Sequence, residues 1–457
     1  KKMNFFLNKK VGVLGLSRTG ISSIKFLKKK GFNVFAWDDN KKVLLEAKKN
    51  KLNIKTINSS NLKKMSFLIT SPGIPATGKN KHFILKQAEK EKVEILNDIE
   101  LFYRFNPEEK YIGITGTNGK STTVCLLSHV FKKLQIDNSL SGNIGKPVFD
   151  LRKFKNKLNI LEISSFQLEV MKRTKLNIAV LLNISKDHIE RHNGFHNYIA
   201  EKVKIFNNQS KNDISIIGVD DKITSSLAKK LKKKLFSKII TISGKNNNAD
   251  ISIKNKKLVI NLNLENKKIL KKINIGCFKN FIGEHNYQNI AAVYAIILSM
   301  GFLNWKKIES SIRSFNILPH RLQKIRKIDN VIYINDSKAT NIDATDHALK
   351  NFNNIYWILG GRAKEKNLYK LKKHFSRIRH VFLVGETKYL YQKYLKNFLN
   401  CTIVKSLKEA VDLSHFHTKN KKMKSPVVLL SPACSSLDEW RDFEERGDAF
   451  IKFVKRI

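Results

Sequence analysis

The chain has 457 residues, of which 42% are hydrophobic and 27% are charged, and its formal net charge at pH 7 is +49. This length predicts about three domains with buried cores, at roughly 150 residues each. The excess of 87 Lys and Arg over 38 Asp and Glu would suggest a nucleic acid or an anionic membrane as partner. The lysines are spread along the entire chain, however, and no nucleic-acid-binding motif accompanies them. We therefore interpret the charge as solvated surface and expect no specific nucleic-acid partner.

The cysteines and the apolar runs indicate where the protein works. Four cysteines, at positions 125, 277, 401 and 434, are far apart and lack the spacing of a metal site. A reducing, cytoplasmic setting fits them best. The longest apolar run, 291–303, is too short to span a bilayer and is interrupted by Ser299 and Gly301, so we expect no membrane insertion.

The first hundred residues have a Rossmann-like βαβ pattern. A strand from Val11 leads into the glycine loop 15–20, a helix to Lys30, and a strand 33–37 that ends at Asp38, where an acidic side chain could bind a ribose. Ser17 replaces the middle glycine of the dinucleotide fingerprint, so a nucleotide is expected but a dinucleotide is disfavoured. A further strand, 66–70, ends in the rigid turn 71–75, Ser-Pro-Gly-Ile-Pro.

A phosphate cradle is predicted in the segment 111–123, Tyr-Ile-Gly-Ile-Thr-Gly-Thr-Asn-Gly-Lys-Ser-Thr-Thr. A short apolar strand runs into a glycine loop, and Lys120 opens the helix that follows. Glycines let backbone N–H groups turn toward an anion, the helix N-terminus adds partial positive charge, and Lys120 adds a full charge. Ser121 can offer its hydroxyl to Mg²⁺. The strict P-loop pattern is missed by one position, at Ile114, and a glycine loop without function is the alternative.

Other chemically suited side chains follow predicted strands in the middle of the chain. Glu162 lies near the end of the strand 159–163, and Asp187 and His188 follow the strand 177–184. Ligands of an open parallel sheet lie beyond the carboxyl ends of its strands. We therefore expect metal or catalytic roles for Glu162 and His188, whereas Asp187 could equally be a helix cap.

A lysine interrupts the apolar stripe of the helix predicted over 197–207. Ile199, Lys202, Val203 and Phe206 have the spacing of one helical face, and an inward lysine must be paired, neutralised or modified. On the pattern alone, the better interpretation is that Lys202 snorkels to the surface. The segment 211–275 reads as strand-rich, with no chemistry that we can assign.

Two asparagines precede an apolar helix predicted over 290–300. Asn286 and Asn289 share a helical face, where side-chain amides could bind a base edge, and helix capping is the competing account.

The last third of the chain reads as another doubly wound sheet. Four predicted strands, 331–334, 355–359, 380–384 and 427–430, each end in small, polar or charged residues. Cys434 follows the last of them and could be proposed as a nucleophile. No histidine lies nearby in sequence to activate it, so we interpret Cys434 as a packed small residue.

Together these motifs resemble the Mur ligase family over essentially the whole chain, and within it the branch that adds D-glutamate. The stretches that carry the resemblance are Gly116-Thr-Asn-Gly-Lys-Ser-Thr122, Gly142-Asn-Ile-Gly145, Leu161-Glu-Ile-Ser-Ser-Phe-Gln-Leu-Glu169, His285-Asn-Tyr-Gln-Asn289, Leu318-Pro-His-Arg321, Asn335-Asp-Ser-Lys-Ala-Thr-Asn341 and Leu430-Ser-Pro-Ala-Cys434. The first is shared with the folylpolyglutamate ligases, and the Ser-Ser-Phe-Gln, Asp-Ser-Lys-Ala-Thr-Asn and Ser-Pro-Ala-Cys stretches point to this branch.

The resemblance implies an α/β fold of three domains. A Rossmann-like domain over 1–107 would bind the UDP substrate, a P-loop-type parallel-sheet domain over 108–316 would bind ATP, and a Rossmann-like domain over 317–457 would bind the amino acid. The implied activity is ATP-dependent addition of D-glutamate to UDP-N-acetylmuramoyl-L-alanine, by a monomer that uses two Mg²⁺ ions and a carbamylated lysine.

The resemblance also implies the site residues. ATP would be bound by Gly116, Thr117, Asn118, Gly119, Lys120, Ser121, Thr122, Asn286, Asn289, Arg321 and Asp336. The catalytic residues would be Lys120, His188, Lys202 and Lys338. Metal would be held by Ser121, Glu162, His188 and carbamylated Lys202. The UDP substrate would lie against Arg18, Thr19, Asp38, Ser71, Pro72, Gly73, Asn143 and His188. D-glutamate would be surrounded by Thr340, Lys364, Ser436, Leu437 and Phe443.

Ser17, in place of a frequent glycine, and Arg362, in place of a common acidic residue, depart from the family pattern. Two other classes of protein explain fewer of these motifs. A dinucleotide-dependent dehydrogenase would leave the cradle idle, and a nucleic-acid-stimulated NTPase would leave the Asp-Ser-Lys-Ala-Thr-Asn stretch unexplained.

Overall fold

The computed structural model describes residues 9–49, 52, 55–151, 158–186, 191–245, 248–264, 267–275, 285–316, 318–363, 367–419 and 425–457. The chain divides into two compact units. The first comprises residues up to 276 together with 287–312, and the second comprises 277–286 together with 313–457. The predicted α/β architecture is confirmed, whereas the predicted domain boundaries at 107 and 316 stay predictions.

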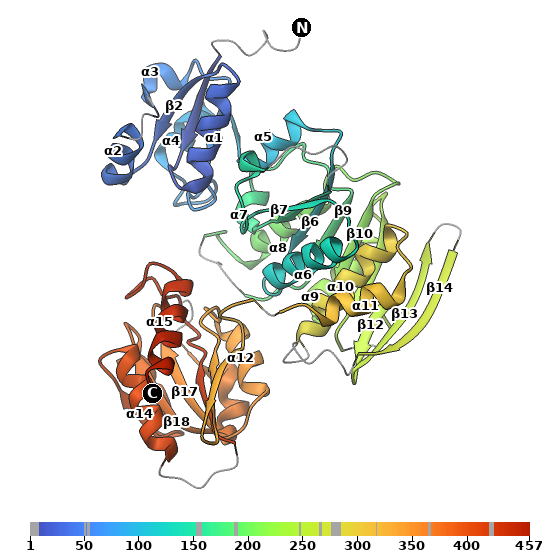
Figure 1. Cartoon of the computed structure of the whole chain (residues 1–457). Helices are drawn as coiled ribbons and strands as arrows, with labels where there is room; N and C mark the ends of the chain where they lie inside the picture. Colours follow the sequence, from blue (N-terminus) through green and yellow to red (C-terminus); the bar gives the residue numbers. More distant parts are fainter. Residues whose placement is uncertain are drawn as a thin grey trace. The chain divides into compact units, whose positions relative to one another are not determined.

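The first sheet of the first unit is five-stranded, parallel and ordered β3-β2-β1-β4-β5. Its strands are β1 (Lys10–Leu14), β2 (Asn33–Trp37), β3 (Lys55–Thr56), β4 (Phe67–Thr70) and β5 (Glu94–Leu96). Its helices are α1 (Arg18–Lys29), α2 (Lys41–Lys49), α3 (Ser59–Leu62), α4 (Phe83–Lys90) and α5 (Asp98–Phe105). Side chains alternate along β1: Val11 and Val13 pack in one core with α1, and Leu14 packs in another with α4. Helices therefore cover both faces (Figure 1).

The second sheet has nine strands in the order β14-β13-β12-β11-β10-β9-β6-β8-β7. The strands are β6 (Lys110–Thr115), β7 (Asn138–Gly142), β8 (Leu158–Glu162), β9 (Ile178–Leu181), β10 (Ile214–Gly218), β11 (Lys238–Ser243), β12 (Ile251–Lys254), β13 (Lys257–Leu264) and β14 (Lys267–Asn274). The predicted parallel sheet is in fact mixed, because β13 and β14 form an antiparallel hairpin at its edge.

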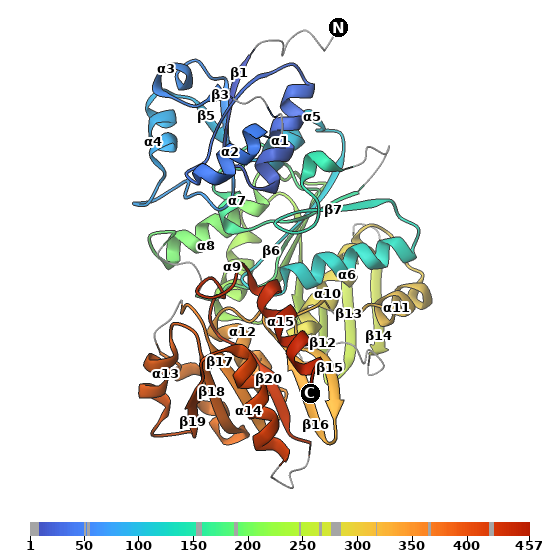
Figure 2. The ribbon, with the colours of Figure 1, turned by 60° about the vertical axis from the view of Figure 1, so that its left-hand side comes forward.

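The helical segments of the same region are α6 (Lys120–Lys133), η1 (Val148–Asp150), α7 (Ser165–Leu168), α8 (Phe195–Val203), η2 (Lys204–Phe206), α9 (Lys222–Leu231), α10 (His285–Ser299) and α11 (Trp305–Arg313). Strand β6 lies between β8 and β9, and α6 packs against β6, β7 and β8 (Figure 2). The loop from β6 to α6 thus lies at the carboxyl edge of the parallel strands, where such sheets bind ligands.

The second unit contains a six-stranded sheet in the order β15-β16-β20-β17-β18-β19. Its strands are β15 (Gln323–Ile328), β16 (Val331–Asn335), β17 (Ile355–Gly360), β18 (Ile378–Val384), β19 (Cys401–Ile403) and β20 (Val427–Leu430). Its helical segments are α12 (Ile342–Lys350), η3 (Tyr369–Arg377), α13 (Lys388–Leu395), α14 (Leu407–Lys419) and α15 (Phe443–Lys455). The four predicted strands are present, and β15 and β19 add an edge on each side.

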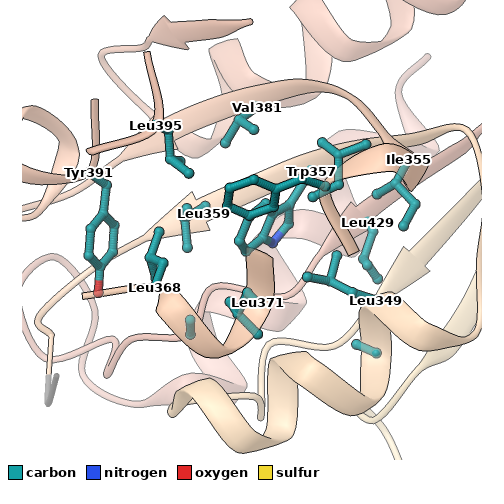
Figure 3. Close-up of a cluster of buried hydrophobic side chains, with 14 of the residues drawn as sticks. Leu349, Ile355, Trp357, Leu359, Leu368, Leu371, Val381, Tyr391, Leu395 and Leu429 are labelled. Atoms are coloured by element: carbon teal, nitrogen blue, oxygen red, sulfur yellow. The ribbon is translucent and has the colours of Figure 1, made fainter. Parts of the chain in front are cut away.

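Trp357 of β17 lies in the centre of one core of this second unit (Figure 3). Leucines from α12, η3, β17 and β20 surround its ring, and its indole N–H donates to the Ser431 carbonyl at 2.8 Å. The buried polar atom is therefore satisfied, so the core holds β17 and β20 firmly beneath the loops at their carboxyl ends.

Candidate active site

The loop between β6 and α6 has the geometry of a phosphate cradle. Gly119 caps α6 at φ +86°, and a Cβ on it would lie 2.4 Å from Asn289 Oδ1, so this position requires glycine. Lys120 Nζ donates to the backbone carbonyls of Gly116 at 2.7 Å and Thr117 at 2.9 Å. The ammonium group thus folds over the loop, at the N-terminus of a 14-residue helix.

An amide network that the sequence did not predict supports this loop. Asn183 accepts from the Asn118 N–H at 2.9 Å, donates to the Asn118 carbonyl at 3.1 Å, and donates to Gln288 Oε1 at 3.0 Å. Gln288 in turn donates to Asp220 at 2.9 Å. Asp220 lies in the segment 211–275, which therefore contributes to holding the cradle.

Glu162 is a buried carboxylate at the end of β8. Asn143 Nδ2 donates to its Oε1 at 2.9 Å, whereas Oε2 has no hydrogen-bond partner among the described residues. A buried, unpaired carboxylate oxygen is costly unless a cation or donor completes it. Ser121, at the start of α6, is also buried. Oxygen donors of these two kinds fit Mg²⁺. Within the described residues, no group of three His, Cys, Asp or Glu side chains gathers as a metal site.

Lys202 is buried, with 1% of its surface exposed, so the snorkelling interpretation is wrong. Its helix is α8, which ends at Val203 and continues as η2. Lys202 Nζ donates to the Gly116 carbonyl at 2.9 Å and lies 3.5 Å from Thr115 Oγ1. Lys120 and Lys202 therefore share one carbonyl oxygen. Asp187 and His188, which were predicted beside them, lie outside the described residues.

The two predicted adenine-side asparagines lie within α10, which begins at His285 and not at Ile290. Asn289 Oδ1 accepts from Thr123 Oγ1 at 3.1 Å, so its side chain joins α10 to α6. Asn286 and Asn289 are both buried.

The loops of the first sheet that were predicted to bind a nucleotide lie together at its carboxyl edge. Asp38 accepts from the Leu16 N–H at 2.7 Å and the Asn40 N–H at 2.8 Å, so its carboxylate orders the loop after β1. Ser71 Oγ donates to the Gly15 carbonyl at 3.1 Å. Beside this contact, Arg18 is exposed and Thr19 is half-buried at the start of α1.

The second unit gathers another group of predicted residues around the loop after β16. Asp336 accepts from Ser431 Oγ at 2.9 Å and from the Leu322 N–H at 3.1 Å, and burial raises the pKa of its carboxyl to about 7. Lys338 Nζ lies 3.6 Å from the centre of the Phe443 ring, a cation–π contact. Arg321 and Thr340 are half-buried, Ser436 is buried and Leu437 is exposed. Lys364 lies outside the described residues.

Arg446 holds this loop and had no signal in the sequence. It is buried in α15 and donates to Ser337 Oγ at 2.9 Å, the Ser337 carbonyl at 2.8 Å and the Cys434 carbonyl at 3.1 Å. Burial lowers the pKa of its guanidinium to about 10. Cys434 is buried and forms no disulfide, and burial raises the pKa of its thiol. Both properties fit a packed residue better than a reactive thiolate. Arg362, the unusual residue, pairs with Glu386 at 3.0 Å.

Comparison with known proteins places this geometry. Three family models match: the "Mur ligase MurD-like, N-terminal domain" over residues 9–97, the "Mur ligase middle domain" over 114–297, and the "Mur ligase, glutamate ligase domain" over 320–434. Two relatives named UDP-N-acetylmuramoylalanine--D-glutamate ligase are similar over full length. The protein from Rickettsia prowazekii is 35% identical over 99% of both chains, and that from Rickettsia bellii is 37% identical over 100% of this chain and 99% of its own.

The chain belongs to the Mur ligase family. The predicted resemblance is thereby confirmed. Solved Mur ligase structures share the fold at low identity: MurF from Thermotoga maritima in complex with ADP has a TM-score of 0.60 and 15% identity, and covers 100% of this chain and 97% of its own. MurC from the same organism has a TM-score of 0.58 and 17% identity, with 98% and 99% covered. No helix in the described part of this Mur ligase is long and apolar enough to cross a membrane.

Proposed function

We propose that this Mur ligase joins D-glutamate to UDP-N-acetylmuramoyl-L-alanine at the expense of ATP, in peptidoglycan precursor synthesis. The cradle formed by Gly116, Gly119 and Lys120 carries the proposal for ATP, because it is built for an anionic phosphate chain. The names of the full-length relatives carry the choice of the other two substrates. We expect a monomer that works in the cytoplasm.

The reaction needs activation because a carboxylate is a poor electrophile. The terminal carboxylate of the muramoyl substrate attacks the γ-phosphorus of ATP, which gives an acyl phosphate and ADP. The amine of D-glutamate then attacks the acyl carbon, the C–O bond to phosphate breaks, and the amine loses a proton as the amide forms. The first step brings several negative charges together, so positive charge held by the protein lowers its barrier.

The residues around the first two sheets would divide this work. Lys120 and the loop 116–122 would hold the phosphates of ATP, with Asn286 and Asn289 toward the adenine. The UDP substrate would lie against Arg18, Thr19, Asp38 and the turn 71–73, with Asn143 near its pyrophosphate and His188 beside its reacting end. In the second unit, Arg321, Asp336 and Lys338 would bind the ATP ribose and phosphates. D-glutamate would contact Thr340, Lys364, Ser436, Leu437 and Phe443.

Ser121 and Glu162 would hold one Mg²⁺, as the unpaired Oε2 of Glu162 suggests. His188 and Lys202 would hold a second. When bound, the two ions neutralise phosphate charge that accumulates during transfer. Asn143, through its hydrogen bond to Oε1, orients the Glu162 carboxylate for this task.

Lys202 would act as a carbamate. Lys120 and Lys202 both approach the Gly116 carbonyl, so two ammonium groups here would repel each other in a buried place. Addition of CO₂ to the neutral Lys202 amine converts an unwelcome cation into an anion with oxygen ligands, which Mg²⁺ prefers.

Phosphate release tests the proposed function. We expect purified protein to release phosphate from ATP only when the muramoyl nucleotide and D-glutamate are both present. Release that needs neither of them, or stimulation by DNA or RNA, would instead indicate an NTPase. Reduction of NAD or NADP without ATP would indicate a dehydrogenase. Replacing D-glutamate with L-glutamate, glycine or D-alanine controls for the identity of the amine.

A further inference from the structure

Arg191 joins the two sheets of the first unit. Its guanidinium donates to three successive backbone carbonyls of the turn after β4: Pro72 at 2.8 Å, Gly73 at 3.2 Å and Ile74 at 2.9 Å. This turn contains the residues Ser71, Pro72 and Gly73 that we assign to the UDP substrate. One planar guanidinium that binds three carbonyls fixes the path of the turn more tightly than any single hydrogen bond would.

Side chains of the segment after β8 contact the Arg191 guanidinium. It stacks over the Phe166 ring, with its central carbon 3.6 Å from the ring centre. Phe166 also stacks on His192, whose Nε2 lies 3.0 Å from Ser165 Oγ and whose Nδ1 lies 3.2 Å from Glu169 Oε1. The Glu169 side chain is completely buried, and this burial raises the pKa of its carboxyl to about 7 while the positive charge of Arg191 opposes the rise. The Glu169 carboxyl therefore lies close enough to the Arg191 guanidinium for their charges to interact.

Two further contacts lie just beyond this turn, at Thr77 and Gly78. A Cβ on Gly78, which adopts φ +78°, would lie 2.6 Å from Asn193 Nδ2, so the chain beyond the turn approaches the residue two places after Arg191. The Thr77 side chain lies beside the Glu169 carboxylate and opposes the rise in the pKa of that carboxyl. Segment 72–78 thus meets Arg191, Glu169 and Asn193 at three separate points.

The position of these contacts gives them a function. The turn follows β4 and is tied to Gly15 through Ser71. Helix α7, which contains Phe166, follows β8, and β8 ends at Glu162. We infer that Arg191 is a positioning residue. It holds the turn 71–75 in the conformation that binds the UDP substrate and keeps this turn at a fixed position relative to the phosphate cradle. This inference rests on the proposed function and goes beyond it, because the hydrogen bonds of Arg191 go to the turn after β4, and no ATP-binding or metal-binding role is assigned to Arg191 itself.

Two variants and one control test the inference by kinetics. Arg191→Ala removes all the contacts, and Arg191→Lys keeps the charge but not the planar fork. Arg173→Ala removes an exposed arginine of the same region. We expect Arg191→Ala to raise KM for the UDP substrate at least tenfold and Arg191→Lys to raise it several-fold. The KM for ATP should change less than twofold in both variants, and Arg173→Ala should match the unaltered protein. Equal changes in the two KM values, or no change, would overturn the inference.

Hydrogen exchange in ligand-free protein gives a readout that does not depend on turnover. The amides of Ile74 and His82 donate to the Ser71 and Pro75 carbonyls, at 3.0 and 3.1 Å, and report the order of the turn. We expect peptides that cover 71–82 to exchange faster in Arg191→Ala while the peptides of β6 and α6 keep their protection. Unchanged exchange over 71–82 would refute the positioning role. If the unaltered protein lacked ligase activity, the proposed function would fail, but the exchange result would still decide whether Arg191 holds the turn.

Discussion

Lys120 is the side chain on which ATP use would depend most directly under the proposed function. Its ammonium is held by the Gly116 and Thr117 carbonyls, and removal of it leaves the loop without the charge that would meet the phosphates. We expect Lys120→Ala to lower kcat/KM by at least a hundredfold, or about 3 kcal/mol of transition-state stabilisation. The unfolding midpoint should stay within a few degrees. Activity within tenfold of the unaltered protein would contradict the cradle assignment, and Lys133→Ala, at the far end of α6, is the matched control.

Lys202 and Lys204 form a second matched pair. Lys202 is buried beside the cradle, whereas Lys204 pairs with Glu201 at 2.6 Å and is partly exposed. If Lys202 acts as a carbamate, Lys202→Ala should lose most activity, and small carboxylic acids in solution should partly restore it by supplying the lost oxygen ligand. Lys204→Ala should keep most activity and gain nothing from the acids. Similar behaviour of the two variants would argue against a carbamate, as would a mass spectrum under CO₂ without the added 44 Da expected for the modification.

Residues differ in how far the sequence reveals them. The positions of Lys120 and Glu162 were predictable because Lys120 follows β6 and Glu162 ends β8, and the apolar runs of both strands are easy to recognise. The burial of Lys202 was not, since helical spacing alone leaves a lysine free to snorkel. Arg191 and Arg446 gave no signal, because most of their hydrogen-bond acceptors lie more than a hundred positions away in the chain, and most are backbone carbonyls, which carry no residue identity.

At the scale of single elements, α5 contains a buried carboxyl group whose effect on the free energy of unfolding depends on pH. Asp98 is 2% exposed at the first turn of this helix, its Oδ1 has no partner among the described residues, and burial raises its pKa from 3.8 to about 6. Between these two values the folded protein keeps a proton that the unfolded chain releases. Stability therefore falls as pH rises from about 4 to about 6, and the loss persists above that range.

Asp98→Asn should remove this dependence, because the amide has nearly the same shape and no charge. The unfolding free energy of the variant relative to the unaltered protein should rise by up to about 3 kcal/mol between pH 4 and pH 7.5. Urea unfolding at the two pH values measures it, and comparison of the two proteins at each pH cancels the other titrating groups. A difference that is the same at both pH values would show that Asp98 does not titrate in this way.

Elements were predictable according to how they are buried. Parallel strands covered on both faces, such as β2 and β20, appear as continuous apolar runs, and the structure places them within one residue of the predicted bounds. The antiparallel strands β13 and β14 mix apolar residues with Lys and Asn, so the sequence indicated strands in the segment 211–275 without their pairing, and β15 was not predicted. The start of α10 was misplaced because its first turn is polar.

For the whole molecule, the net charge of +49 is the property most open to misreading. We expect binding to DNA at low salt, through release of counterions, and its collapse by physiological ionic strength. Fluorescence anisotropy with two unrelated duplexes over a salt series measures it. Preference for one sequence, or binding that persists at about 150 mM salt, which is near physiological ionic strength, would indicate a specific nucleic-acid-binding surface instead.

The hairpin at the end of the nine-stranded sheet gives the lysines a different use. Strand β14 is the last in its sheet, and four of its eight residues are lysines. An edge strand exposes unpaired N–H and C=O groups that could recruit another chain, and lysines along it oppose this by mutual repulsion. Lys268 and Lys272 are exposed beside Leu270, which is 63% exposed. Changing both lysines to Thr should therefore lower the protein concentration at which light scattering detects aggregates, so part of the charge surplus protects this chain, rich in Ile and Asn, from self-association.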